Sequence, residues 1–111
     1  MMGDPWTLDP EMKVLRDEFV ASFVERRRVL KGILEKLKNR GGEASQELPK
    51  ELMAEYKMMV HRLAGVARTY GFDQLGEIAE NLDDRLDTGI GSVADWINEG
   101  EKLARALNSA A

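Results

Sequence analysis

The sequence contains no cysteine and a single histidine, His61. The absence of cysteine excludes a disulfide framework and a thiolate nucleophile. One histidine cannot supply the nitrogen and sulfur ligands of an ordinary zinc site. We therefore expect neither a bound metal nor a cofactor, and any chemistry that needs an imidazole must use His61.

Long apolar runs are also missing. No stretch of about 18 apolar residues predicts a membrane span, and no apolar run near the N-terminus resembles a signal peptide. The formal charge is −4 and the pI is near 5.1, whereas a nucleic-acid binder needs a basic face. The basic run Arg26-Arg27-Arg28 lies among acidic residues and is typical of a solvated helix face. We expect a cytoplasmic protein that binds neither nucleic acid nor membrane.

Proline is scarce, and the alternation typical of strands is absent. Prolines occur only at positions 5, 10 and 49, and apolar residues recur at three- and four-residue spacing, which predicts helices. The length of 111 residues fits one domain, with residues 1–8 as an N-terminal tail and residues 9–111 as the folded unit. Short connections place consecutive helices antiparallel. The predicted fold is therefore all-α, an up-down-up-down four-helix bundle.

Capping residues mark the ends of the four helices. Asp9-Pro10 begins the first, which runs to about Asn39; the second extends from near Ser45, through Pro49, to Tyr70 before Gly71. The third has Asp73 as its N-cap and stops by Gly89, and the fourth begins at a capping box formed by Ser92 and Asp95. The residues expected to face the core in the first, third and fourth helices are Met12, Leu15, Phe19, Phe23, Leu30, Ile33 and Leu37; Leu75, Ile78, Ala79, Leu82 and Leu86; and Val93, Trp96, Ile97, Leu103, Ala104 and Leu107.

The second helix places its histidine on the solvent side. Six apolar residues fall within roughly ±40° of one line at about 100° per residue, which predicts that this line faces the core. They are Leu52, Tyr56, Met59, Leu63, Val66 and Tyr70. His61, nine residues after Leu52, lies roughly 180° from that line.

The neighbours of His61 on this exposed face suit phosphoryl chemistry. An exposed imidazole has a reference pKa near 6.5 and can attack phosphorus when it is unprotonated. Lys57 and Arg68 could stabilise the negative charge of a phosphoryl group. The small residues Ala64 and Gly65 would leave room for a second protein, although Gly65 could instead let a neighbouring helix approach.

The pattern His61-x-Leu63-x-Gly65 followed by Gly71-Phe72, on the second helix of a four-helix bundle, resembles the histidine phosphotransfer (HPt) domain of bacterial multistep phosphorelays. The resemblance implies that His61 accepts a phosphoryl group from the aspartate of one receiver domain and passes it to another. It implies a phosphocarrier rather than an enzyme, with metal and catalysis supplied by the receiver.

One position departs from the family pattern. The family commonly has lysine three residues after the histidine, where this chain has Ala64. The electrostatic role then falls to Lys57 and Arg68. The partners that the resemblance implies are receiver domains of response regulators and a hybrid sensor kinase, and we expect the chain itself to be a monomer.

Docking also needs apolar surface near the histidine. Met58 and Val60 lie off the predicted core line of the second helix, and Val20 and Val24 lie far from Leu15 around the first helix. These four could surround His61 with a small apolar patch. The alternative hypothesis is a helical interaction module, a degenerate HPt domain that binds a partner without carrying phosphate.

Overall fold

The structure, a computed structural model, describes residues 10–40, 50–89 and 91–110. All regular structure in these ranges is helical, which confirms the all-α class. The elements are α1 (Pro10–Ala21), α2 (Phe23–Arg40), α3 (Lys50–Ala67), the short 3₁₀ helix η2 (Arg68–Tyr70), α4 (Asp73–Thr88) and α5 (Val93–Ala110).

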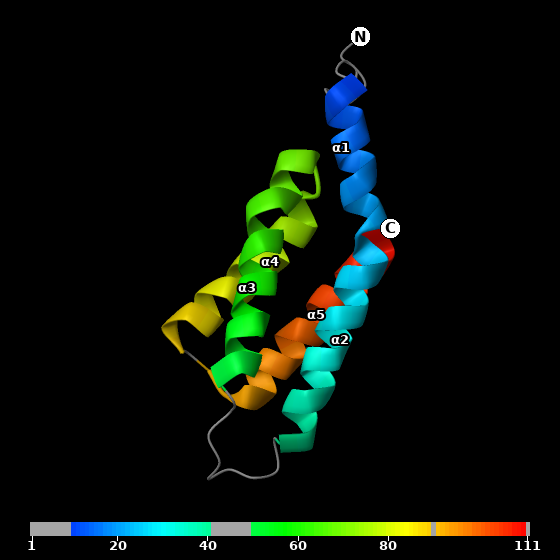
Figure 1. Cartoon of the computed structure of the whole chain (residues 1–111). Helices are drawn as coiled ribbons and strands as arrows, with labels where there is room; N and C mark the ends of the chain where they lie inside the picture. Colours follow the sequence, from blue (N-terminus) through cyan, green and yellow to red (C-terminus); the bar gives the residue numbers. More distant parts are fainter. Residues whose placement is uncertain (1–9, 41–49, 90, 111) are drawn as a thin grey trace.

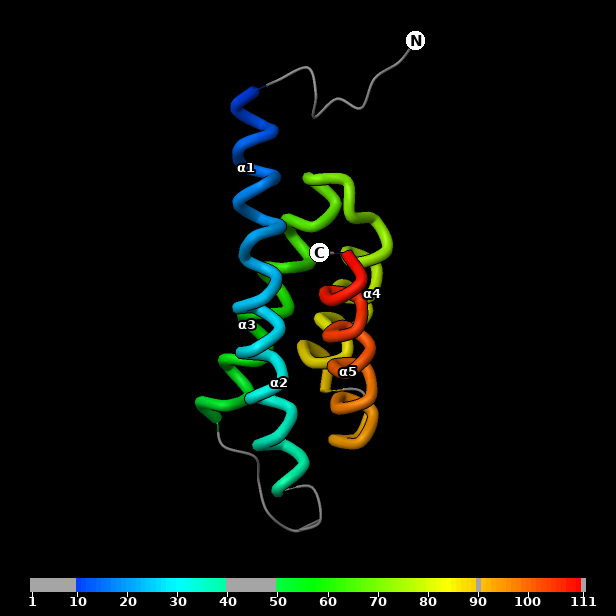
Figure 2. Tube along the Cα trace, turned by 90° about the vertical axis from the view of Figure 1, so that its right-hand side faces the viewer, coloured from blue at the N-terminus to red at the C-terminus, as the bar shows by residue number. Residues whose placement is uncertain are grey.

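The helices form a bundle of four rods, in which each rod runs antiparallel to the next along the chain. Helices α1 and α2 lie end to end as one long rod, beside α3, α4 and α5 (Figures 1 and 2). Helix α2 packs against α3 and α5, and α4 packs against the same two helices from the other side. The predicted up-down-up-down four-helix bundle is therefore confirmed, with its first helix divided into α1 and α2.

The core is formed by aliphatic and aromatic side chains from every rod of the bundle. Tyr56 of α3 is fully buried and reaches across to α5, where its hydroxyl donates a hydrogen bond to the carbonyl of Trp96 (2.7 Å). This bond satisfies a polar group that would be costly to bury alone. Gly100 brings α5 close at the same level, because a Cβ there would overlap the Tyr56 hydroxyl and Leu34.

The first predicted helix is interrupted at Ser22. The Ser22 amide donates to the carbonyls of Glu18 and Phe19 (both 3.1 Å), and the amide of Arg26 donates to the Ser22 carbonyl (2.9 Å). The Ser22 hydroxyl donates to the Phe19 carbonyl and accepts a hydrogen bond from Arg26 Nε (2.8 Å). A serine hydroxyl that bonds back to the preceding turn competes with the helical bonds, so Ser22 separates α1 from α2 although the two helices still lie end to end.

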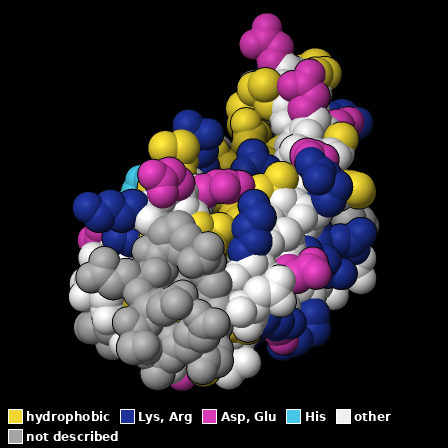
Figure 3. All heavy atoms as spheres, turned by 60° about the horizontal axis from the view of Figure 1, so that its bottom comes forward, with side chains coloured by type: hydrophobic (Ala, Val, Ile, Leu, Met, Phe, Trp, Pro, Cys, Tyr) yellow, Lys and Arg dark blue, Asp and Glu magenta, His cyan; other side chains and the backbone are white. Residues whose placement is uncertain are grey.

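The prediction that Leu15 faces the core is wrong. Its side chain is 45% exposed, and Val14 beside it is also exposed. The first turns of α1 project past the end of the bundle (Figures 1 and 2), and hydrophobic side chains are visible on this projection in Figure 3. Packing begins only further along α1, where Phe19 is buried and Arg16 lies over the ring of Phe72 (4.8 Å to its centroid).

The predicted helix ends agree with the structure at most described positions. Gly71 and Gly89 adopt left-handed conformations (φ 87° and 70°). Ser92 and Asp95 form the capping box, with amide-to-side-chain distances of 2.9 and 3.2 Å. Asp73 is not the N-cap of α4, because the carbonyl of Phe72 already accepts the first helical bond, from Gly76 (2.9 Å). The expected tail (residues 1–8) and the helix start through Ser45 and Pro49 lie outside the described residues.

Candidate functional site

His61 lies on the outer surface of α3, as the helical spacing predicts. Its side chain is 77% exposed, and its ring leans toward α4, where Nδ1 lies 2.9 Å from Oδ2 of Asp83. A carboxylate can only accept hydrogen bonds, so this contact favours a proton on Nδ1. The other nitrogen, Nε2, has no hydrogen-bond partner among the described residues, and its lone pair is available to an incoming group.

Asp83 was not identified from the sequence. It lies on α4 next to the buried Leu82, and its side chain is only 23% exposed. The antiparallel packing of α3 and α4 places it opposite His61. The sequence does show an acidic pair, Asp83 and Asp87, four residues apart on one face of a helix. It does not show how α3 and α4 align, and that alignment is needed to place the pair beside His61.

The carboxylates of α4 change the protonation of the histidine. The hydrogen bond to Asp83, followed by the negative charge of Asp83, raises the pKa of His61 above its ordinary value; desolvation opposes this, and the charge of Asp87 adds a smaller increase. At a given pH, His61 is therefore protonated to a greater extent than a free histidine. The expectation that His61 behaves as an unperturbed imidazole needs this correction.

The two cations predicted to assist His61, Lys57 on α3 and Arg68 at the start of η2, differ in their contacts. The Arg68 guanidinium pairs with Glu80 on α4 (Nη2 to Oε2, 3.0 Å), and the Arg68 side chain crosses Gly76, where a Cβ would lie 2.6 Å from Arg68 Cγ. Lys57 is exposed and forms no ion pair within the described ranges. The structure thus leaves the charge of Lys57 available while that of Arg68 is shared with a carboxylate.

Of the two small residues expected to give clearance, only Gly65 is open. A Cβ at Gly65 would meet no atom within 4 Å, so this glycine does not serve close packing between helices. Ala64 is buried, contrary to the expected exposed position. His61 and Arg68, one turn away on either side of Ala64, both reach α4, so Ala64 lies beneath them on the α4 side.

Of the four residues predicted to dock a partner, two are exposed and two are not. Met58 and Val24 are exposed, as expected, whereas Val60 is fully buried and Val20 is half-buried against the core. The buried residues of α3 span an arc of about 120° from Leu52 to Ala64 at about 100° per residue. The core side of α3 is therefore turned toward α4, because α3 packs on α4 as well as α2.

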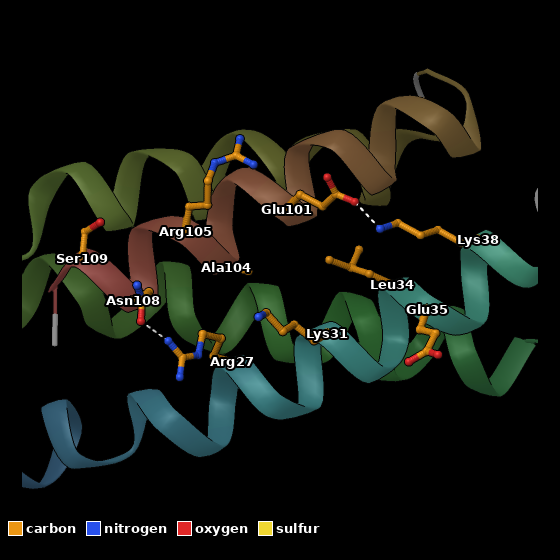
Figure 4. A pocket seen from close by; sticks show the side chains of 10 residues that line it. All are labelled: Arg27, Lys31, Leu34, Glu35, Lys38, Glu101, Ala104, Arg105, Asn108 and Ser109. Atoms are coloured by element: carbon orange, nitrogen blue, oxygen red, sulfur yellow. Dashed lines mark hydrogen bonds and ion pairs between the residues drawn. The ribbon is translucent and has the colours of Figure 1, made fainter.

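A groove of about 840 Å³ lies away from the histidine, between α2 and α5 (Figure 4). Two side-chain contacts bridge it, Lys38 to Glu101 and Arg27 to Asn108. Its lining residues are Arg27, Lys31, Leu34, Glu35, Lys38, Glu101, Ala104, Arg105, Asn108 and Ser109. His61 is not among them. The histidine is instead 77% exposed on the surface of α3, which suits a reacting group presented by another macromolecule.

Fold and site together define a helical bundle that presents one exposed histidine beside a carboxylate. Residues 15–111 match the family model described as the Hpt domain, and the chain therefore belongs to the Hpt domain family. No curated protein matches the chain, and no solved structure does. Membership indicates a phosphotransfer role in two-component signalling, where Hpt domains are phosphocarriers that interact with receiver domains and kinases. None of the helices in the described ranges is long and apolar enough to cross a membrane.

Proposed function

We propose that His61 accepts a phosphoryl group from the aspartate of a receiver domain and relays it to another receiver. One observation carries the proposal: the only histidine of the chain is exposed on an open helix face, with Nδ1 engaged by Asp83 and Nε2 unoccupied among the described residues. Family membership supplies the reaction class. The donor and acceptor are receiver domains of response regulators or of a hybrid sensor kinase.

The chain contributes a nucleophile on a rigid helix, and its partner contributes the rest of the chemistry. Phosphoryl transfer relies on a metal and on positioned charges. Within the described residues, no group of three or more histidine, aspartate or glutamate side chains could hold a metal ion. We infer that the receiver supplies magnesium and the phosphorylated aspartate, and that the chain is a monomeric cytoplasmic phosphocarrier built from residues 9–111.

The surface around His61 supports docking of a folded partner. Gly65, one turn beyond the histidine, leaves the space above the helix open. Exposed Met58 lines a shallow groove between α2 and α3 together with the half-buried Val29 and Met59, and Val24 on α2 is exposed as well. A receiver could therefore bury apolar surface on α2 and α3 while its aspartyl phosphate approaches Nε2.

We further propose that Lys57 and Arg68 stabilise the phosphoryl group electrostatically. Lys57 lies four residues before His61, one helical turn away, and its ammonium is unpaired among the described side chains. Arg68 lies two turns beyond His61, and its pairing with Glu80 reduces the charge that it offers. Lys57 is therefore the stronger contributor in this proposal.

The function is tested by ³¹P NMR after incubation with a receiver domain, magnesium and acetyl phosphate. We expect an acid-labile phosphohistidine resonance in the native protein and none in His61→Gln. The substitution should leave the melting temperature nearly unchanged, because this side chain is exposed.

A panel of receivers from the source organism makes the negative result informative. If none of them produces phosphohistidine while one binds the folded protein, the chain is a helical interaction module that does not carry phosphate. A resonance that persists in His61→Gln would instead show that the phosphoryl group is on another residue.

A further inference from the structure

We propose that the groove between α2 and α5 is a binding site for a small anion that carries two or more acidic groups, carboxylate or phosphate. The groove has a volume of about 840 Å³, which is within the size range of small-molecule sites. The proposed function does not use this surface, so the inference goes beyond that function and does not depend on it.

Two side-chain contacts close the groove at its ends. Lys38 contacts Glu101 across one end, and Arg27 donates a hydrogen bond to Asn108 across the other (Figure 4). Glu101 and Asn108 are about two helical turns apart on α5, or roughly 10 Å. The space between the contacts therefore suits a compact ligand, because a longer occupant, such as a helix of another protein, would have to break both of them.

The side chains that line the groove carry an excess of positive charge, although the protein as a whole is acidic. The formal charge of the chain is −4, whereas cations outnumber carboxylates two to one in the groove. The charged lining residues are Arg27, Lys31, Lys38 and Arg105, against Glu35 and Glu101. The groove therefore attracts an anion more strongly than the average surface of this protein does.

Arg27 and Lys31 provide the positive charge that no carboxylate neutralises. The only partner of Arg27 among the described residues is the uncharged amide of Asn108, and Lys31 forms no ion pair within the same ranges. The two cations are one turn apart on α2, and Figure 4 shows Lys31 between α2 and α5. A guanidinium binds an oxyanion through paired hydrogen bonds, and an ammonium adds a point charge. Together they suit two acidic groups of one ligand.

The remainder of the lining does not oppose such a ligand. Glu101 is engaged by Lys38, whose hydrogen bond and charge hold the pKa of Glu101 below its ordinary value; desolvation opposes this, and the charge of Arg105 adds a smaller decrease. Glu35 points away from α5 (Figure 4). The floor is formed by the almost fully buried Leu34 and Ala104. An apolar floor strengthens the attraction between the cations and an anion above it.

The groove and His61 lie on opposite edges of the bundle. Helix α2 packs against α3 and α5, and α4 packs against the same two helices from the other side. The edge between α2 and α5 is therefore diagonal to the edge between α3 and α4, where His61 contacts Asp83. We expect an anion in the groove to remain bound while another protein contacts His61.

The test is an NMR titration of the ¹⁵N-labelled protein at constant ionic strength. The probes are citrate, inorganic diphosphate and acetate, the last of which has only one acidic group. The native protein is compared with Arg27→Gln and Lys31→Gln, each of which removes one charge from the groove. Lys36→Gln is the matched control, because Lys36 is an exposed lysine of α2 that does not line the groove. Melting temperatures establish that each variant is folded.

We expect citrate, diphosphate or both to cause saturable shifts of the amides along the facing parts of α2 and α5. Acetate should bind at least about tenfold more weakly, since it cannot engage both cations. Arg27→Gln and Lys31→Gln should each weaken binding about five- to tenfold, and Lys36→Gln less than about twofold. The probe that binds more tightly identifies the preferred acidic group as carboxylate or phosphate.

Several results would overturn the proposal. One is the absence of saturable shifts with either polyanion. Another is equal weakening in Lys36→Gln and Lys31→Gln, which would show a diffuse attraction to surface charge. Shifts confined to the face of His61 would place the anion outside the groove. Binding of an acidic helical peptide but of neither small anion would make the groove a protein-docking surface instead. None of these measurements needs a receiver, so the proposed phosphotransfer function is tested separately.

Discussion

Gly65 in α3 and Gly100 in α5 are both glycines inside helices, and their surroundings are opposite. At Gly65, next to the histidine face, an added Cβ would meet nothing within 4 Å. At Gly100, the same Cβ would overlap Leu34 and the hydroxyl of Tyr56. The first glycine faces the space above the bundle, and the second faces its interior.

The difference shows that a helical glycine has no single meaning in this molecule. Each glycine costs about 1 kcal/mol relative to alanine through backbone entropy. At Gly100 the close packing of α5 on α2 and α3 offsets that cost. At Gly65 no packing within the described chain does so, and the proposed function gives this glycine the role of leaving a partner access to His61.

Substitution of Gly100 should have the largest effect on stability. In Gly100→Ala, the overlap with Leu34 and Tyr56 should cost about 1–3 kcal/mol, partly offset by roughly 1 kcal/mol of helix propensity. Thermal and urea unfolding should therefore show a net loss of up to about 2 kcal/mol. An unchanged or increased stability would show that α5 can move away without cost, and the contrast between the glycines would disappear.

Substitution of Gly65 should affect transfer instead of folding. Gly65→Ala should increase the unfolding free energy by about 1 kcal/mol, and Gly65→Leu should be at least as stable as the native protein. Gly65→Leu should slow transfer from a phosphorylated receiver about tenfold, because leucine occupies the space that the partner needs. Gly32→Ala, at another glycine with open surroundings, controls for the gain in helix propensity. Native transfer rates in Gly65→Leu would contradict the clearance role.

The smallest expected effect concerns the two cations on the open face. Lys57→Ala should reduce the initial rate of phosphohistidine formation a few-fold, because it removes an unpaired charge. Arg68→Ala should reduce it less, since Glu80 already shares that charge. Lys57→Arg retains the charge and serves as the control. A larger loss in Arg68→Ala would show that the pair with Glu80 opens during transfer.

Much of the fold could be predicted because local patterns determine it. The spacing of apolar residues predicts the helices, and the capping box of Ser92 and Asp95 forms as expected. The predictions failed where a neighbour decides the outcome. Leu15 has the spacing of a core residue but is exposed, because none of the described helices lies beside the first turns of α1. Val60 is buried, because α4 widens the buried side of α3.

For the site, the sequence by itself determined that the chain has one imidazole, that it lies on the outer face of a helix and that Gly65 follows one turn later. Only the tertiary structure decided that Ala64 is buried, that Glu80 shares the charge of Arg68 and that Asp83 binds Nδ1. Which residues share a face of one helix depends only on their spacing within that helix, so the sequence is enough to predict it. The register between two helices depends on how their side chains interdigitate, and no single segment contains that information.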